Sequence, residues 1–198
     1  DQLNVPKDHP SRDMQDTFWF KEKDVSEPTV MRTQSSNVQV RYMENNQPPI
    51  KIIAPGKVFR NETTDATHEA QFYQCEGLVI DKGISLGHLK GTLEYFFVRF
   101  IEEKVDVRLR PGFFPFVEPG VEVDMKMISS ESKLGGKWIE MMGAGMVHPN
   151  VLRNCGIDPD VYSGFAFGMG IDRLGVMKYG VEDVRDFYSG DLRFVNQF

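Results

Sequence analysis

Apolar and charged residues alternate regularly in one segment of the chain, from Val121 to Met127. Glu122, Asp124 and Lys126 separate its apolar side chains, and this period of two predicts a strand with one apolar and one charged face. After Ser85 the spacing changes, and apolar residues recur one, three or four positions apart. That spacing predicts a helix that packs its apolar face in the core. The face consists of Leu86, Leu89, Leu93, Phe96, Phe97, Phe100 and Ile101.

The stretch from Gly56 to Gly77 predicts a hairpin with a polar face. Strand-like composition in Lys57–Glu62 and Gln71–Ile80 flanks a polar connection, Thr63–Ala70. Two interpretations of the face stay open. In the first, the face is the floor of a binding site, because its mixture of cation, carboxylate, aromatic and amide groups is costly to bury without a partner. In the second, it is the solvated face of an edge hairpin. The face consists of Val58, Arg60 and Glu62 on one strand and Phe72, Gln74 and Glu76 on the other.

Three elements are predicted before this hairpin. The aromatic run Thr17–Phe20 fits a buried strand, and a strand over Ile50–Ala54 leads into the hairpin. Ser35–Ser36 precedes a predicted helix over Asn37–Asn46, because serine is a favoured residue at a helix N-terminus. The inward face of this helix is predicted to hold Val38, Tyr42 and Met43.

The second half of the chain predicts more strands than helices. Prolines and glycines in Arg110–Gly120, RPGFFPFVEPG, are expected to prevent regular pairing in the middle of this segment. A strand over Tyr162–Met169 runs into a helix over Gly170–Tyr179, whose first turn carries Arg173. Hairpin connections with few helices indicate an α+β fold around an antiparallel sheet. The other predicted features are strands over Asp106–Arg110 and Lys137–Met142, a flat stretch at Gly143–Gly145 and a short helix over Asn150–Cys155.

Composition narrows the class of protein. A hydrophobic content of 40% and a charged content of 26% are ordinary for a globular protein, and no apolar run approaches the roughly 20 residues of a membrane span. Without a signal-peptide pattern, a cytoplasmic location is the expectation. The net charge of −6 argues against a surface devoted to gripping a phosphate backbone. Two cysteines allow at most one disulfide, exclude a cysteine-rich zinc site, and are expected to be reduced.

Several blocks of the sequence, in order and spacing, resemble the α-subunit family of bacterial phenylalanyl-tRNA synthetases, which are class II aminoacyl-tRNA synthetases. The resemblance runs from Asp1 to Phe198. It implies a class II synthetase-like antiparallel sheet flanked by helices. The matching blocks are DHPSRDMQDTFWF, APGKVFRNETTDATHEAQFYQCEGLVID, RPGFFPFVEPG, GKWIEMMGAGMVHPNVL and YSGFAFGMGIDRLGVMKYGVEDVRDFYSGDLRFVNQF.

The resemblance implies activation of L-phenylalanine by ATP and its transfer to tRNA(Phe). Activation joins a carboxylate to the α-phosphate, so the protein mainly has to position the reactants and neutralise phosphate charge. By resemblance, Arg60 bridges the carboxylate and the α-phosphate, and Arg173 contacts the γ-phosphate. The other ATP residues implied are Glu62, His68, Phe72 and Gly170, with Arg60, His68 and Arg173 counted as catalytic and Glu140 as a Mg²⁺ ligand.

The amino-acid pocket is implied in the same way. Gln74 and Glu76 match the residues that receive the α-ammonium, with Ser36 beside them. The aromatic pair Phe114 and Phe116 is implied to meet the substrate ring edge to face, an arrangement that aromatic rings prefer. The ring-binding residues implied are Phe114, Phe116, Val117 and Ala166, the last two near the para position.

The resemblance also implies partners, although the sequence departs from the family's commonest pattern at a few positions. Residues 1–198 would form a single catalytic domain that lacks the family's N-terminal coiled-coil arm and works with a large β subunit in a heterotetramer. The motif-1 region, His9–Phe20, would then form part of a subunit interface. Two other hypotheses are a stand-alone paralogue that binds or activates an amino acid without charging tRNA, and an inactive structural fragment. The departures are Asp172, Ala144, Tyr73 and Gln34.

Overall fold

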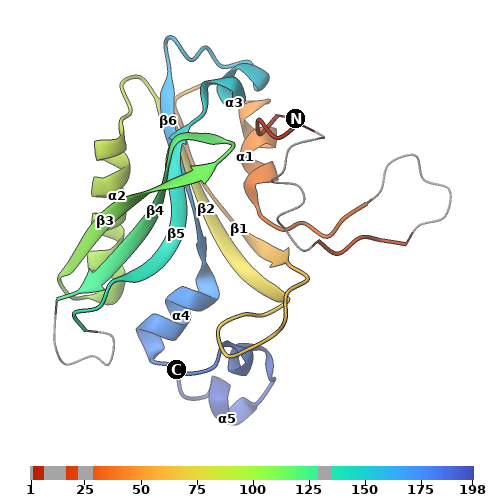
Figure 1. Ribbon diagram of the computed structural model, residues 1–198, viewed down its shortest axis with the longest axis vertical. Helices are drawn as coiled ribbons and strands as arrows, with labels where there is room; N and C mark the ends of the chain where they lie inside the picture. The colour runs from red at the N-terminus through yellow and green to blue at the C-terminus, as the bar shows by residue number, and fades with distance from the viewer. Residues whose placement is uncertain (1, 7–16, 22–28, 129–134) are drawn as a thin grey trace.

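The fold is built on one antiparallel sheet, seen in a computed structural model that describes residues 2–6, 17–21, 29–128 and 135–198 (Figure 1). Within this described part, six strands lie in the order β1-β2-β6-β5-β4-β3. Every neighbouring pair is antiparallel, which confirms the predicted α+β architecture. The strands are β1 Ile50–Phe59, β2 Gln71–Asp81, β3 Val105–Phe114, β4 Val117–Met127, β5 Ile139–Val147 and β6 Ser163–Gly170.

Helices pack on both faces of the sheet. The helix α2, Leu86–Ile101, places Leu89, Leu93 and Phe97 in the larger hydrophobic core, as its spacing predicts. The smaller core lies on the other face, where Leu78 and Ile80 of β2 meet α1 and α3. These elements are α1 Ser36–Met43, α3 Pro149–Asn154, α4 Ile171–Tyr179, the 3-10 helix η2 Val184–Tyr188 and α5 Leu192–Val195.

Among the described helices, α1 and α3 cover one end of the face that holds the smaller core. Alternation along β2 puts Gln74 and Glu76 on the same face as Leu78, farther from α1 and α3. Alternation along β4 puts Glu122 and Asp124 on this face as well, opposite the apolar residues that meet α2. The face therefore changes along the strands from apolar to charged. Among the described residues, no helix combines the length and apolarity of a membrane span.

The predicted inward face of the first helix was partly wrong. Met43 is buried, but Val38 and Tyr42 are exposed, and the helix ends at Met43 rather than Asn46. The polar residues Ser36 and Gln39 are buried instead. They lie one turn apart and both bond to the carboxylate of Glu76 on β2. These polar contacts decide which face of the helix points inward, whereas the prediction used apolar spacing alone.

The run Thr17–Phe20 was predicted to be buried, and this was wrong for its aromatic residues. Phe18, Trp19 and Phe20 are all exposed. In the described part of the chain, the segment pairs with residues 29–31, through a bridge between Trp19 and Val30. This narrow ribbon extends away from the sheet in Figure 1, so much of the surface of its aromatic side chains stays exposed. The rest of the predicted interface segment, residues 9–16, lies outside the described residues.

Pairing through RPGFFPFVEPG is irregular in the middle, as predicted, because the register shifts between Gly112 and Phe114 and again between Val117 and Gly120. The strand β3 nevertheless continues past its predicted end at Arg110. Pro111 pairs with Val121 and Gly112 with Gly120. The β3 strand is at the sheet edge, where a proline without an N–H is tolerated, and a register shift in β4 contains Pro119. The flat stretch at Gly143–Gly145 lies inside β5, which extends beyond the predicted strand. In the first hairpin, β1 ends at Phe59 rather than Glu62.

Candidate active site

The polar hairpin face forms the floor of a cavity of about 930 Å³. Val58 lies opposite Phe72, Gly56 opposite Gln74, and Ala54 opposite Glu76, which confirms the shared face for Val58, Phe72, Gln74 and Glu76. Arg60 and Glu62 follow the end of β1, so the strand register does not place them on this face. Gln74 and Glu76 are buried, so the alternative of a wholly solvated face is wrong. Nine predicted site residues line the cavity: Ser36, Arg60, Glu62, Gln74, Glu76, Phe114, Phe116, Val117 and Ala166.

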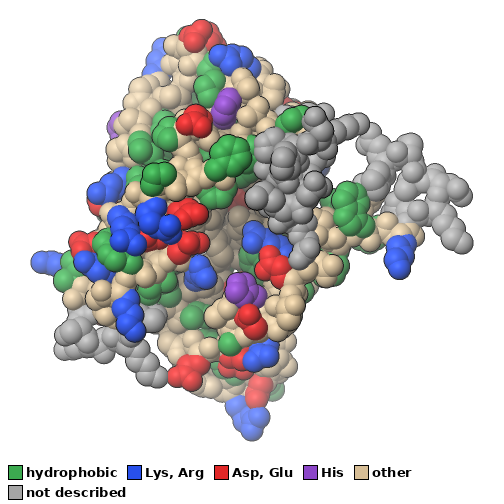
Figure 2. Space-filling view, viewed as in Figure 1, with side chains coloured by type: hydrophobic (Ala, Val, Ile, Leu, Met, Phe, Trp, Pro, Cys, Tyr) green, Lys and Arg blue, Asp and Glu red, His purple; other side chains and the backbone are tan. Residues whose placement is uncertain are grey.

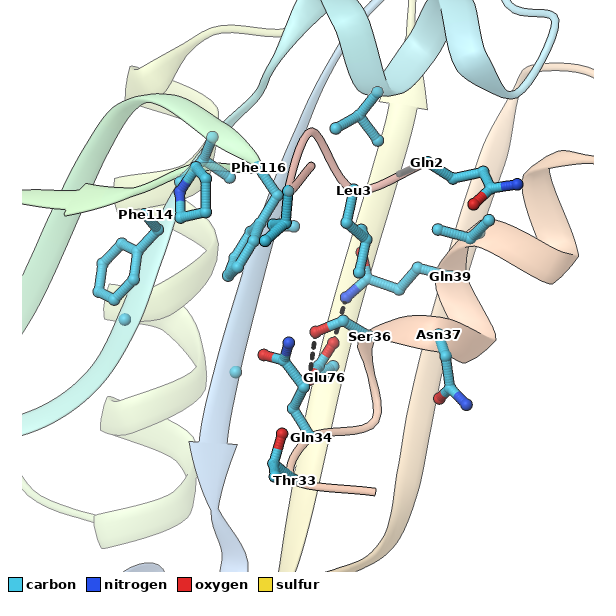
Figure 3. Close-up of a pocket in the computed structure, with 18 of the residues that line it drawn as sticks. Gln2, Leu3, Thr33, Gln34, Ser36, Asn37, Gln39, Glu76, Phe114 and Phe116 are labelled. Atoms are coloured by element: carbon cyan, nitrogen blue, oxygen red, sulfur yellow. Dashed lines mark hydrogen bonds between the residues drawn. The ribbon is translucent and has the colours of Figure 1, made fainter. Parts of the chain in front are cut away.

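The carboxylate of Glu76 is the most deeply buried charge of the cavity, with 3% of the residue exposed. It accepts hydrogen bonds from Ser36 Oγ at 2.8 Å, Gln39 Nε2 at 2.5 Å and Gln74 Nε2 at 3.2 Å (Figure 3). Burial raises the pKa of this carboxyl, although the bonds from Ser36 and Gln39 act in the opposite direction. Each of these partners is uncharged, so a cationic ligand would relieve the cost of burying the charge.

Gln39 is a site residue that the sequence reasoning missed. It follows Ser36 by three positions, so both side chains lie on one face of α1. That spacing was a usable signal, because a polar pair on a buried helical face requires a polar partner. The helix therefore supplies two hydrogen bonds that orient Glu76.

Glycines keep the centre of the floor flat. Gly168 of β6 lies between Glu76 and Gly143 of β5 in the sheet. A Cβ atom at Gly168 would come within 2.8 Å of Gln74 Nε2, and one at Gly143 within 2.7 Å of Phe114 Cζ. The glycines thus leave room for Gln74 and for the ring of Phe114 to lie over the backbone.

The end of the cavity nearer α1 and α3 is apolar. Phe116 and Ala166 pack against the smaller core, and Val117 is buried beside them. The rings of Phe114 and Phe116 lie 6.1 Å apart at 27°. This end suits a hydrocarbon or aromatic group, while Glu76 suits a cation, so the cavity matches an amphipathic ligand.

Arg60 stands at the opposite, polar side of the cavity. Its backbone N–H bonds to Ala70 O at 2.9 Å, and its guanidinium lies 5.1 Å from the centre of the Phe72 ring. Within the described residues, Arg60 Nε and Gln74 Oε1 are buried without a hydrogen-bond partner. Buried polar atoms normally have partners, so both atoms point to a polar ligand.

The remaining predicted residues, His68, Phe72, Glu140, Gly170 and Arg173, lie outside the cavity lining. The ring of His68 is exposed in the β1–β2 loop, with Nδ1 3.1 Å from Asp65. Hydrogen bonds, chiefly from Thr67, hold the pKa of Asp65 below its usual range. The loop is therefore locally ordered although it is exposed.

The charged end of the face carries an arginine network. Arg110 bonds to Glu122 and Asp124 at 2.7 Å and to Glu140 at 3.2 Å, and Arg173 Nη1 donates to Glu140 O at 2.8 Å. The bond from Arg110, before that from Arg108, lowers the pKa of Asp124. Figure 2 shows basic and acidic side chains gathered over β3–β5 beside the hollowed centre of the molecule.

Asp172 anchors the helix that carries Arg173. Its carboxylate accepts the backbone N–H of Tyr73 and the hydroxyl of Tyr188, each at 2.8 Å. Burial and, secondarily, this bond raise the pKa of Tyr188. The strand β6 ends at Gly170, opposite Gln74. The anchor therefore places the start of α4 next to Tyr73, which lies between Gln74 and the β1–β2 loop.

Glu140 fits a role as a single carboxylate ligand of Mg²⁺. Its side chain is 58% exposed, and Mg²⁺ commonly uses one or two carboxylates together with waters and phosphate oxygens. In the described part of the chain, no three His, Cys, Asp or Glu side chains are grouped to hold a metal by themselves. Cys75 and Cys155 are free thiols, as expected.

Comparison with known proteins gives consistent matches. The family model of the tRNA synthetases class II core domain (F) matches residues 1–198. The chain is 56% identical to the phenylalanine–tRNA ligase alpha subunit of Alkaliphilus oremlandii (strain OhILAs), and 53% identical to that of Clostridium beijerinckii. These matches cover 100% and 99% of the chain but 58% of each relative, so the chain spans little more than half their length.

A solved structure gives the same fold at low identity. The pyrrolysyl-tRNA synthetase from Desulfitobacterium hafniense aligns with a TM-score of 0.63 over 96% of this chain and 62% of that chain. The two sequences are 18% identical, so this likeness shows the class II synthetase-like fold alone.

Proposed function

The chain belongs to the tRNA synthetases class II core domain (F) family, and from this premise we propose that it is the catalytic core of a phenylalanine–tRNA ligase α subunit. It activates L-phenylalanine with ATP and transfers the phenylalanyl group to tRNA(Phe) in the cytoplasm. Residues 1–198 act as one catalytic domain, and a β subunit completes the enzyme. The identity to phenylalanine–tRNA ligase alpha subunits supports this choice of substrate and partner.

The observation that carries the proposal is the buried Glu76 carboxylate beside an apolar recess. An α-amino acid with an aromatic side chain carries both an ammonium group and an aromatic ring in one small molecule. Glu76 binds the ammonium group, and Gln74 adds an acceptor through Oε1, which has no hydrogen-bond partner among the described residues. The ring then extends toward Phe116 and Ala166, where a tyrosine hydroxyl would have no polar partner.

The polar side of the cavity serves the nucleotide. Arg60 binds the substrate carboxylate and the α-phosphate together, because its planar guanidinium has several donors in one fork. Arg173 and His68 bind the outer phosphates, while Phe72, Glu62 and the backbone at Gly170 hold the adenosine. Glu140 provides a ligand for Mg²⁺, which neutralises phosphate charge when it is bound.

The proposal is tested by ATP–pyrophosphate exchange and by aminoacylation of tRNA(Phe), with and without the β subunit. We expect exchange that depends on phenylalanine and charging that requires the complex. Exchange driven by another amino acid, or by none, contradicts the proposal. Exchange without charging, even in the complex, indicates a stand-alone amino-acid-activating paralogue instead. Absence of both from a folded complex indicates a structural fragment.

Substitution of Ala166 by glycine is expected to admit para-substituted phenylalanines. Removing the methyl group at the apolar end of the cavity creates space where Ala166 lines it. The kcat/KM ratio of a para-substituted analogue to phenylalanine should rise at least about tenfold, since small volume changes in apolar pockets have effects of this size. Exchange kinetics with both substrates measure the ratio. An unchanged ratio removes Ala166 from the substrate pocket.

A further inference from the structure

A short segment before the first helix closes part of the amino-acid cavity. We call residues 2–6 the N-terminal strap. Asn4 Nδ2 donates to Pro115 O at 2.7 Å, and Asn150 Nδ2 of α3 donates to Asn4 Oδ1 at 3.1 Å. Asn154 Nδ2 donates to Gln2 O at 3.3 Å. The strap is therefore fastened both to α3 and to the turn between β3 and β4.

The position of Asn4 is specific to its residue type. Its φ of 59° lies in the left-handed region, which asparagine adopts more readily than most other non-glycine residues. In this conformation its amide uses both its oxygen and its nitrogen as a bridge across the cavity rim. The carbonyl that it binds belongs to Pro115, the residue between Phe114 and Phe116.

The neighbouring residue, Leu3, faces the cavity. Leu3 is half-buried, packs against the smaller hydrophobic core and lines the cavity, as do Phe116 and Ala166. Figure 3 shows its side chain pointing inward between Phe116 and Gln39, above the hydrogen-bonded Glu76. The side chain thus adds an apolar wall beside the group of residues that holds the buried carboxylate.

We propose that Leu3 is a specificity-determining residue for the aromatic side chain of the substrate, and that Asn4 is the positioning residue that holds Leu3 and the Phe114–Phe116 turn together. This inference rests on the proposed function. Leu3 limits the width of the ring site, so that phenylalanine fits and wider aromatic amino acids are excluded. Asn4 acts through the Pro115 carbonyl and does not touch the substrate.

The test uses the full-length chain assembled with its β subunit. Leu3→Ala should raise the KM for phenylalanine about tenfold and raise the kcat/KM ratio of 2-naphthylalanine to phenylalanine by a similar factor, because one wall is lost. Leu3→Met, which nearly conserves volume, should keep both values close to wild type. Leu192→Ala is the matched control, since Leu192 is 73% exposed at the surface near the C-terminal end.

Asn4 is tested by a separate pair of variants. Asn4→Gly permits the same backbone conformation but removes the amide, and Asn4→Asp retains an acceptor while losing the donor to Pro115. Both should raise the KM for phenylalanine with little change in kcat, because the reacting groups are untouched. A melting curve for each variant shows whether the fold is intact.

The outcomes separate the two proposals. If the wild-type complex shows phenylalanine-dependent exchange and Leu3→Ala leaves the KM and the analogue ratio unchanged, the role of Leu3 is overturned and the proposed function stands. If the wild type shows no such exchange, the proposed function fails and the ligand named for Leu3 fails with it. Should Leu3→Ala unfold, Leu3→Phe decides, because filling the site must lower kcat/KM for phenylalanine selectively over smaller amino acids.

Discussion

Substitution of Arg60 by alanine is expected to lower phenylalanine-dependent ATP–pyrophosphate exchange by about a thousandfold, the scale of losing a preorganised donor to a developing charge. The guanidinium lies beside Phe72, and its Nε is buried without a partner in the described chain. Among the described residues, the other cation that lines the cavity is Arg41, which is exposed on α1. Exchange kinetics at saturating ATP measure the loss.

Two variants give this prediction its controls. Arg60→Lys keeps a positive charge but lacks the planar fork, so it should recover only a small part of the activity. Arg99→Ala removes an exposed arginine from α2, on the opposite face of the sheet, and should leave exchange near wild type. Activity within a few-fold of wild type in Arg60→Ala, with an unchanged melting temperature, would contradict the assigned role.

Replacing Glu76 by glutamine should raise the KM for phenylalanine on the order of a hundredfold, because removing one member of a buried charge pair commonly costs several kcal/mol. The amide can still accept from Ser36, and Gln39 can present its oxygen to the new NH₂ group, so the fold should remain intact. Steady-state exchange kinetics measure the KM. Glu94→Gln, at an exposed ion pair on α2, is the matched control. A KM within threefold of wild type would contradict ammonium binding by Glu76.

Stability should change in the opposite direction to binding in this variant. Burial raises the pKa of Glu76 in the folded state above the ordinary value of 4.5, so the folded wild-type protein holds its proton more tightly than the unfolded chain. The stabilisation of the protonated form is present below pH 4.5 and is lost as the pH rises through the raised pKa. The amide does not titrate. Without amino acid, Glu76→Gln should therefore gain melting temperature relative to wild type between pH 4.5 and neutrality.

Periodic elements were predictable from the sequence because one physical cause dominates each of them. In α2 the burial of Leu89, Leu93 and Phe97 decides the orientation, and the spacing of these residues displays it directly. The strand β4 follows the same logic, with Val123 and Met125 in the core. Its charged face was harder to interpret, since Asp124 is 2% exposed and paired with arginines from the next strand.

The errors arose where partners distant in sequence decide the outcome. Gln39 is buried because Glu76, on a strand far along the chain, accepts its hydrogen bond. The strand β3 continues through Pro111, past its predicted end at Arg110, because β3 is an edge strand, which only the sheet order reveals. The strap carries no periodic signal at all, and its position depends on the amide of Asn4 and a left-handed backbone.

The site residues were located mainly by resemblance, and the geometry adds a physical reason for only some of them. Ser36, Gln74 and Glu76 form one hydrogen-bonded group around a buried charge. The roles of His68 and Arg173 remain predictions, since these side chains lie on exposed segments outside the cavity lining. The nucleotide contacts that we propose for the loop and α4 would form only on binding and would leave no trace in the packing of the chain alone.

The glycine floor has a consequence for how this protein tolerates change. Where Gly168 and Gly143 meet, peptide groups themselves form the surface, and the shape of the site is encoded by missing side chains. Mutation at such positions can only add atoms, so damage arises through obstruction of neighbours rather than through loss of a contact. Libraries that broaden substrate range should therefore leave these two positions invariant and vary the cavity walls, where volume can be removed as well as added.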